Sequence, residues 1–89
     1  MNIKTMHQLR TLHPAFFEQQ RAQGYRIESP FLKHGYFIMS FMSAVNDKDS
    51  RIYSIFRYDG NIDTIVYIDT RRSRESAVDF IRSKQRINI

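Results

Sequence analysis

The dipeptide Asp59-Gly60 separates two stretches in which apolar and polar residues alternate, 51–58 and 62–69. Alternation with a period of two is typical of β-strands, and an Asp-Gly pair readily accepts the positive φ angles of a type I′ turn. The sequence therefore predicts an antiparallel hairpin over residues 51–69, and the other elements have to assemble around it.

Two more strands are expected before the hairpin. Residues 36–45 alternate, and because both of their faces carry apolar side chains we expect a central strand. Residues 25–29 predict a strand that Pro30 ends or confines to a sheet edge. The polar stretch 46–50 predicts the loop that leads into the hairpin.

Apolar residues recur at helical spacing near both ends of the chain. Thr5 is the expected N-cap of a first helix, in which Pro14 predicts either a kink or a split into two pieces. The second piece is expected to run to about Gln23, where Gly24 ends it. A C-terminal helix is expected over residues 73–86, with an apolar stripe formed by Ala77, Val78, Phe80 and Ile81.

The predicted fold class is α+β, with a four-stranded antiparallel meander sheet. The N-terminal helix, kinked or split at Pro14, and the C-terminal helix are expected to pack on one face of this sheet. The chain of 89 residues is expected to form a single compact domain, 1–89, because a second core would have too few apolar side chains to offset its ordering entropy. The hydrophobic content of 42% is that of a globular protein.

The sequence lacks the residues that several kinds of catalytic and metal site require. The chain has no cysteine, which excludes disulfides, a thiolate nucleophile and cysteine metal sites. The histidines lack the spacing of a metal site, the serines have no nucleophile-elbow glycines, and three glycines are too few for a phosphate-cradling loop. We therefore expect no cofactor and no metal and favour a protein that is not an enzyme, although acid–base catalysis by a carboxylate pair stays open.

The N-terminus lacks the apolar core of a signal peptide, and no run approaches the roughly 20 apolar residues of a membrane span. We therefore expect a cytoplasmic protein without membrane contact, as a monomer or a homodimer.

The net charge is +5, and residues 69–89 hold six Arg or Lys against three Asp or Glu. Such a basic segment is either a surface for nucleic acid or a solvated charged face.

The start of the C-terminal helix is the first candidate site. Ser73 is the expected N-cap. Arg71, Arg72 and Arg74 then lie beside free backbone N–H groups, an arrangement that suits phosphate because helix N-termini attract anions and Arg adds bidentate contacts. In the alternative, these long side chains swing away and pair with nearby carboxylates such as Asp69.

The strand 51–58 supplies the second group of candidates, with Tyr and Arg interleaved on one face. These residues are Arg51, Tyr53, Ile55 and Arg57, with Tyr67 as a neighbour from the returning strand. On an open sheet face they would form a platform on which bases stack, whereas in the alternative they simply cover the sheet. Arg82, further along the C-terminal helix, would extend a stripe that follows a nucleic-acid backbone.

Residues 52–74, "IYSIFRYDGNIDTIVYIDTRRSR", resemble the hairpin-then-arginine segment of the RelE-type ribosome-dependent ribonuclease toxins, which are also small and basic. The resemblance implies four arginines that hold mRNA phosphate while a Tyr or His assists cleavage. These are Arg51, Arg57, Arg71 and Arg72. The usual toxin begins with a strand before its helices, and no such strand is expected in this chain.

Residues 70–77, "TRRSRESA", are similar in character to the basic start of the last helix in double-stranded-RNA-binding domains. The additional strand and the lack of an alanine-rich last helix separate this chain from that family.

The favoured function is that of a small non-enzymatic binding protein with a basic, Arg-rich surface. Its expected partners are nucleic acid, either RNA or DNA, or a protein or nucleoprotein complex. The alternative is an inhibitor of the kind encoded by phages and plasmids, which binds and occludes a host complex such as a defence system by docking on an acidic patch. A ribonuclease toxin is the third possibility.

Overall fold

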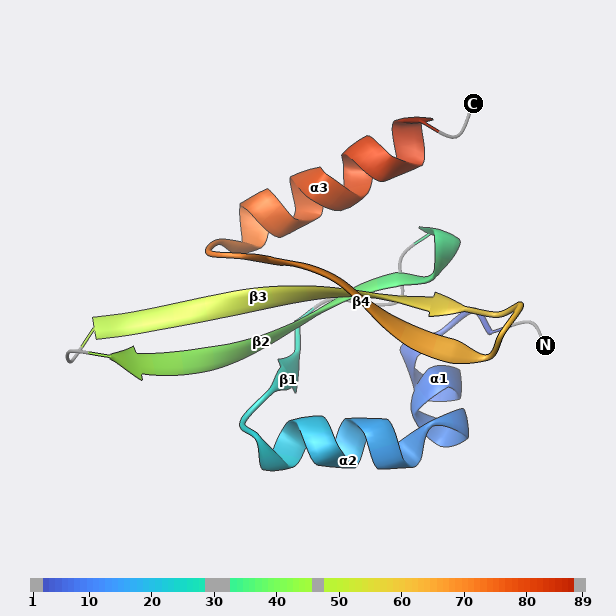
Figure 1. Ribbon diagram of the computed structural model, residues 1–89, viewed down its shortest axis with the longest axis horizontal. Coiled ribbons are helices and arrows are strands. Elements are labelled where there is room, and N and C mark those ends of the chain that lie inside the picture. The colour runs from blue at the N-terminus through green and yellow to red at the C-terminus, as the bar shows by residue number, and fades with distance from the viewer. Residues whose placement is uncertain (1–2, 29–32, 46–47, 88–89) are drawn as a thin grey trace.

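The computed structural model describes residues 3–28, 33–45 and 48–87 of the chain. The elements follow in the order α1 (Met6–Leu12), α2 (Pro14–Ala22), β1 (Arg26–Ile27), η1 (Lys33–Gly35), β2 (Tyr36–Val45), β3 (Lys48–Asp59), β4 (Thr64–Arg71) and α3 (Arg74–Ile87). The strands form one antiparallel sheet in the order β1-β2-β3-β4 (Figure 1). The predicted α+β class and the four-stranded meander are confirmed.

The N-terminal helical region is split at Pro14, one of the two outcomes that the sequence left open. The Thr5 side chain accepts a hydrogen bond from the Gln8 backbone N–H at 3.1 Å, so Thr5 is the N-cap of α1. Pro14 is the first residue of α2, where its missing N–H costs no helical hydrogen bond. Gly24 follows α2 with a φ of 93°, as expected of a residue that ends a helix.

The hairpin is present, but its turn is not the predicted two-residue type I′ turn at Asp59-Gly60. Asp59 pairs with Thr64, so the connection contains four residues, 60–63. The Asp59 carboxylate accepts a hydrogen bond from the Asn61 backbone N–H at 3.0 Å, which closes a local Asx turn and favours the longer loop. The positive φ of this loop belongs to Asp63, at 50°.

Strand lengths also differ from the expected ones. β3 begins at Lys48, which pairs with Val45, so the predicted loop 46–50 is shorter than expected. β1 contains two residues instead of the five of 25–29, and the predicted role of Pro30 lies outside the described residues. β4 covers Thr64–Arg71, so it begins and ends two residues later than the expected strand 62–69. Its pairing with β3 is irregular between Ile55 and Phe56.

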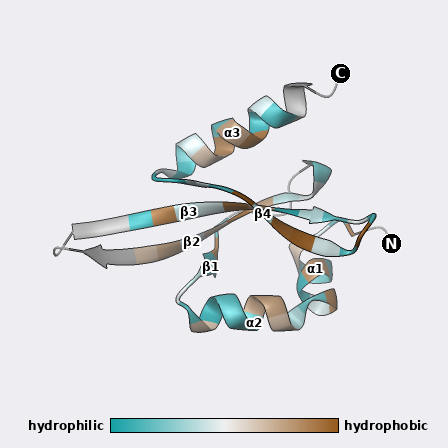
Figure 2. Ribbon diagram, in the orientation of Figure 1, coloured by the Kyte–Doolittle hydropathy of each residue, from teal (hydrophilic) through white to brown (hydrophobic). Residues whose placement is uncertain are grey.

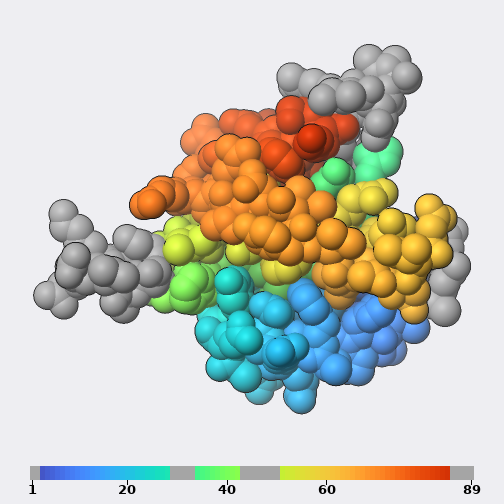
Figure 3. Space-filling model, in the orientation of Figure 1, coloured from blue at the N-terminus to red at the C-terminus, as the bar shows by residue number. Residues whose placement is uncertain are grey.

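The expectation that the helices share one face of the sheet is wrong. α1 and α2 lie below the sheet and α3 lies above it (Figures 1 and 3). Leu9 and Phe17 pack with one set of strand residues, whereas Ala77 and Ile81 pack with the opposite set. The first set is Phe37, Met39, Phe56 and Tyr58, and the second is centred on Ile38 and Ile55.

The alternation of side chains explains this three-layer arrangement. Phe37 and Ile38 are both fully buried although they are neighbours in β2, because successive side chains of a strand point to opposite faces. Brown apolar segments therefore occur in the sheet and in helices on both sides of it (Figure 2). A sheet that is apolar on both faces needs a cover on each of them.

Candidate functional site

The N-terminus of α3 has the predicted capping geometry. The Ser73 hydroxyl accepts a hydrogen bond from the Ser76 backbone N–H at 3.0 Å, and the Ser73 carbonyl accepts one from the Ala77 N–H at 3.1 Å. Arg72 and Arg74 flank this cap and are both exposed. Neither side chain has an ion pair or hydrogen bond within the part of the chain that the structure describes. The positive charges of Arg72 and Arg74 at the start of α3 are therefore not neutralised by any of the described residues.

Arg71 is not free in the same way as Arg72 and Arg74, because its guanidinium group makes contacts within the chain. Its Nη2 lies 3.0 Å from Asp69 Oδ2, and its Cζ lies 5.0 Å from the centre of the Phe80 ring. Pairing with Asp69 is the alternative that the sequence left open for this arginine. Nε of Arg71 is buried without a hydrogen-bond partner among the described residues.

Two other predicted arginines also make contacts inside the chain. Arg51 Nη1 donates to Ser40 Oγ at 2.9 Å. Arg57 Nε donates to the His34 carbonyl at 2.9 Å. These bonds fix both side chains along β3, so each has less freedom to reach a partner than Arg72 or Arg74.

The predicted stacking platform is covered rather than open. Ile55 is fully buried beneath α3, and Tyr53 packs against the same cluster. Tyr53 is paired with Arg71 in the ladder, so the sheet does bring these two predicted residues together. Tyr67 is 56% exposed but lies on the other face, where its ring meets Phe56 edge-on at 5.9 Å. The interpretation as an open platform is therefore wrong.

Arg82 is exposed but distant from the start of α3. It follows Arg74 by eight residues, which corresponds to about 12 Å along the helix axis. It does not belong to the same cluster as Arg72 and Arg74. The cluster that remains from the predicted residues, called the α3-start pair below, consists of Arg72 and Arg74.

A polar network at the edge of the sheet was not predicted. The Glu28 carboxylate accepts hydrogen bonds from Ser40 Oγ and from Arg26 Nε, each at 2.6 Å. The Ser40 hydrogen bond, followed by Arg26, holds the pKa of Glu28 below its usual value. Because Ser40 is fully buried and belongs to β2, the network ties the two-residue strand β1 to the sheet.

A second unpredicted cluster joins the α1–α2 junction to the hairpin loop. Asp63 Oδ1 accepts a hydrogen bond from the Tyr58 hydroxyl. The same oxygen lies 3.0 Å from His13 Nε2 and forms a second hydrogen bond with it. The bond from Tyr58, and then that from His13, lowers the pKa of Asp63, and the same bond raises the pKa of Tyr58. The cluster fastens two elements that are 50 residues apart in the chain.

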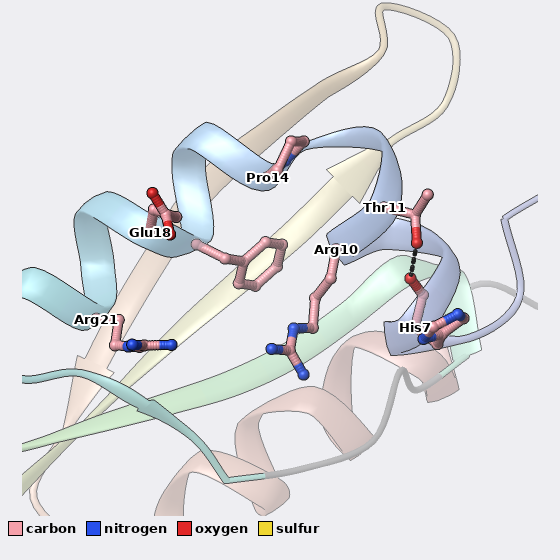
Figure 4. Close-up of a pocket in the computed structure, with 7 residues that line it drawn as sticks. His7, Arg10, Thr11, Pro14, Glu18 and Arg21 are labelled. Atoms are coloured by element: carbon pink, nitrogen blue, oxygen red, sulfur yellow. Dashed lines mark hydrogen bonds between the residues drawn. The ribbon is translucent and has the colours of Figure 1, made fainter.

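A hollow between α1 and α2 is the third unpredicted feature. It has a volume of about 330 Å³ and is lined by His7, Arg10, Thr11, Pro14, Phe17, Glu18 and Arg21. Arg10 and Arg21 extend toward it from the two helices (Figure 4). Nothing in the charge pattern singled out these arginines, because they are 11 positions apart and stand in separate helices.

The described residues contain no cluster of three or more His, Asp or Glu side chains placed to hold a metal ion. None of the helices that the structure describes has the length and hydropathy needed to cross a membrane. Comparisons with known protein families, with characterised proteins and with solved structures find no match to this chain. Its function therefore has to be inferred from its own geometry.

Proposed function

We propose that this protein is a non-enzymatic binding protein of the cytoplasm that contacts nucleic acid, free or within a nucleoprotein complex, through the α3-start pair. The observation that supports the proposal is that Arg72 and Arg74 are exposed and unpaired among the described residues, while Arg51, Arg57 and Arg71 are held by the fold.

Helix geometry adds to the attraction for phosphate. The Ser73 cap satisfies the backbone N–H groups of Ser76 and Ala77. The first two N–H groups of α3, those of Arg74 and Glu75, then have no acceptor inside the helix. These amides and the helix dipole favour an anion at the same place as the two guanidinium groups. Because Glu75 offsets part of the positive potential of the helix end, Arg72 and Arg74 supply most of the attraction for phosphate.

Two observations bear on the other functions considered. A RelE-like toxin would need four arginines to hold mRNA phosphate, namely Arg51, Arg57, Arg71 and Arg72. The first three are engaged within the chain, which argues against this function. An inhibitor that docks on an acidic protein surface is supported by a specific feature, the hollow that receives Arg10 and Arg21.

The test is the salt dependence of binding, measured by fluorescence anisotropy with labelled DNA and RNA in single-stranded and duplex form. Each lost phosphate contact lowers the slope of log K against log salt by about 0.9 for duplex DNA. The double variant Arg72→Ala with Arg74→Ala should therefore lower the slope by about 2 and weaken binding to all sequences alike.

The matched control is Arg10→Ala with Arg21→Ala. Both double variants lower the net charge from +5 to +3, but the control residues lie on the opposite side of the sheet from α3. Equal losses in the two variants would show that net charge, and not a local contact, drives binding. Absence of binding by the wild-type protein at low salt would refute the proposed function.

A further inference from the structure

β4 forms one edge of the sheet. In the order β1-β2-β3-β4 it pairs with β3 and with no other described strand. Figure 3 shows the gold and orange atoms of β4 at the surface, with α3 above them and α1 and α2 below. Every second residue of an edge strand points its backbone N–H and C=O away from the sheet. These groups form a row of hydrogen-bonding partners for another strand.

The regular part of this edge is short. The register passes from Tyr67 directly to Asp69, so Ile68 is an extra residue on β4. A bulge of this kind bends the strand and interrupts its pairing. Beyond it, the Thr70 backbone N–H already donates to the Asp69 carboxylate at 2.8 Å. The part of β4 that is open to a further strand is therefore residues 64–67, which we call the β4 edge.

Exposed apolar side chains gather at the β4 edge. Five large hydrophobic side chains are exposed among the described residues, and three of them belong to the stretch 62–67, namely Ile62, Val66 and Tyr67. A fourth, Leu12, precedes His13, which is hydrogen-bonded to the same hairpin loop. Single exposed hydrophobic residues are ordinary, but a group of them indicates a surface that contacts another molecule. Here the group lies beside the outer backbone of an edge strand.

The β4 edge lacks the features that keep sheet edges apart. Natural edge strands are protected by Lys, by Pro, by other charged side chains or by being very short. Residues 64–67, "TIVY", contain no charge and no proline. The opposite edge differs, because β1 has only two residues and its Arg26 forms an ion pair with Glu28 at 2.6 Å. The sheet therefore has one protected edge and one that is open to pairing.

The chemistry of the β4 edge decides what occupies it. Because it carries no charged side chain, it offers no contact that would favour an acidic or a basic ligand. A row of outward N–H and C=O groups is satisfied by another extended backbone. A second copy of this chain presents the same free edge. Two such edges that run antiparallel about a two-fold axis satisfy each other, and the pair then has no free β4 edge.

We propose that two copies of this chain form a dimer by antiparallel pairing of residues 64–67 of β4. Ile65, Val66 and Tyr67 then face β-branched and aromatic residues of the second copy, which are favourable cross-strand neighbours. The two-fold axis is normal to the sheet, so both α3 helices lie on the same face of one continuous sheet. Both α3-start pairs would then face the same nucleic acid, a consequence that, unlike the dimer itself, rests on the proposed function.

Sedimentation equilibrium without nucleic acid tests the dimer at protein concentrations between about 1 µM and 1 mM. The mass should rise with concentration from that of one chain, 10.7 kDa, toward twice this value and no further. A ladder of about four residues is a small interface, so we expect the transition at high micromolar concentration. Val66→Lys places a charge on the edge of both copies and should raise the dissociation constant about tenfold or more.

The matched control is Met42→Lys. Met42 is 40% exposed and Val66 is 38% exposed, and they belong to β2 and β4 of the same sheet. Both variants therefore gain the same charge at similar exposure, and the control should associate like the wild type. Far-UV circular dichroism checks that both variants keep the wild-type spectrum.

Disulfide trapping locates the contact without a change of charge. The chain has no cysteine, so single cysteines can be introduced at each of residues 64–67 and, as a control, at Met42. In a two-fold antiparallel pair one residue lies opposite its own copy, with the two Cβ atoms about 4–5.5 Å apart, near the range that a disulfide needs. Mild oxidation should therefore link one of the four β4 variants into a dimer and leave Met42→Cys monomeric.

The inference is overturned if the wild type stays monomeric up to about 1 mM, or if its mass continues to rise beyond that of a dimer. It is also overturned if both lysine variants weaken association equally, if only Met42→Lys weakens it, or if no β4 cysteine is trapped. Should Val66→Lys fail to fold, the trapping result decides. Because no nucleic acid is present in these experiments, a failure of the dimer is distinguished from a failure of the proposed function.

Discussion

Two glycines with similar backbone angles should differ sharply in their tolerance of alanine. Gly24 has a φ of 93° and Gly35 has a φ of 83°, both in the region that residues with a Cβ rarely adopt. A Cβ added at Gly24 would meet no atom within 4 Å, whereas one added at Gly35 would lie 2.5 Å from the backbone carbonyl oxygen of Tyr58. Gly24→Ala therefore measures the backbone conformation alone, and Gly35→Ala adds a steric overlap with β3.

The expected costs follow from this difference. A left-handed conformation costs a residue with a Cβ about 1–2 kcal/mol, which is the loss of unfolding free energy expected for Gly24→Ala. At Gly35 the backbone of β3 must also move, at a further cost of about 1–3 kcal/mol, for a total of about 2–5 kcal/mol.

Urea unfolding followed by circular dichroism measures both losses. The reasoning is refuted if the two variants lose equal stability within about 0.5 kcal/mol, or if Gly24→Ala is the more damaging change.

Ile81→Ala and Leu9→Ala remove fully buried side chains from the two opposite faces of the sheet, so each should lower the unfolding free energy by about 2–5 kcal/mol. Ile62→Ala, at a position that is 63% exposed, should change it by less than about 0.5 kcal/mol, and a small loss at Ile81 would contradict the packing of α3 on the sheet. The pKa of Asp63 is lowered in the folded protein, so its contribution is present above the unfolded pKa and is lost as the pH falls through the folded one. Unfolding free energies measured between about pH 2 and pH 6 should therefore fall less on acidification in Asp63→Asn than in the wild type, and identical slopes would contradict the Tyr58–Asp63 contact. Glu28→Gln should show the same flattening, because Ser40 and Arg26 lower the pKa of Glu28.

Local sequence signals predicted the elements of this fold well. Thr5 and Ser73 cap their helices through side-chain oxygens, and Pro14 stands at a helix start, as their chemistry requires. The Asp59-Gly60 signal predicted the hairpin but not its loop. The Asp59 carboxylate can also close an Asx turn, and this competing hydrogen bond decides the loop length.

The placement of the helices was less predictable, although its cause is visible in the sequence. Apolar residues on both faces of residues 36–45 imply that both faces need a cover. Which helix covers which face depends on contacts between distant residues, such as Ile81 with the cluster around Ile55. Periodicity along one segment contains no information about such contacts.

The candidate site shows the same limit. Sequence placed Arg71, Arg72 and Arg74 together because they are neighbours, but the direction of β4 turns Arg71 toward Asp69 and Phe80. The convergence of Arg10 and Arg21 could not be predicted, since it arises from the angle between two helices that meet at Pro14. Exposed arginines are recognised in a sequence, but whether two of them face the same space is a property of the fold.

The most direct test of the proposed function maps the nucleic-acid contact onto the molecule. Two-dimensional ¹⁵N–¹H NMR spectra of the labelled protein are recorded while an oligonucleotide that binds at low salt is added. We predict that the largest shifts occur at the backbone amides of residues 72–76, where the α3-start pair and the open N–H groups lie. Shifts confined to α1 and α2, or spread evenly over all basic residues, would contradict a contact at the start of α3.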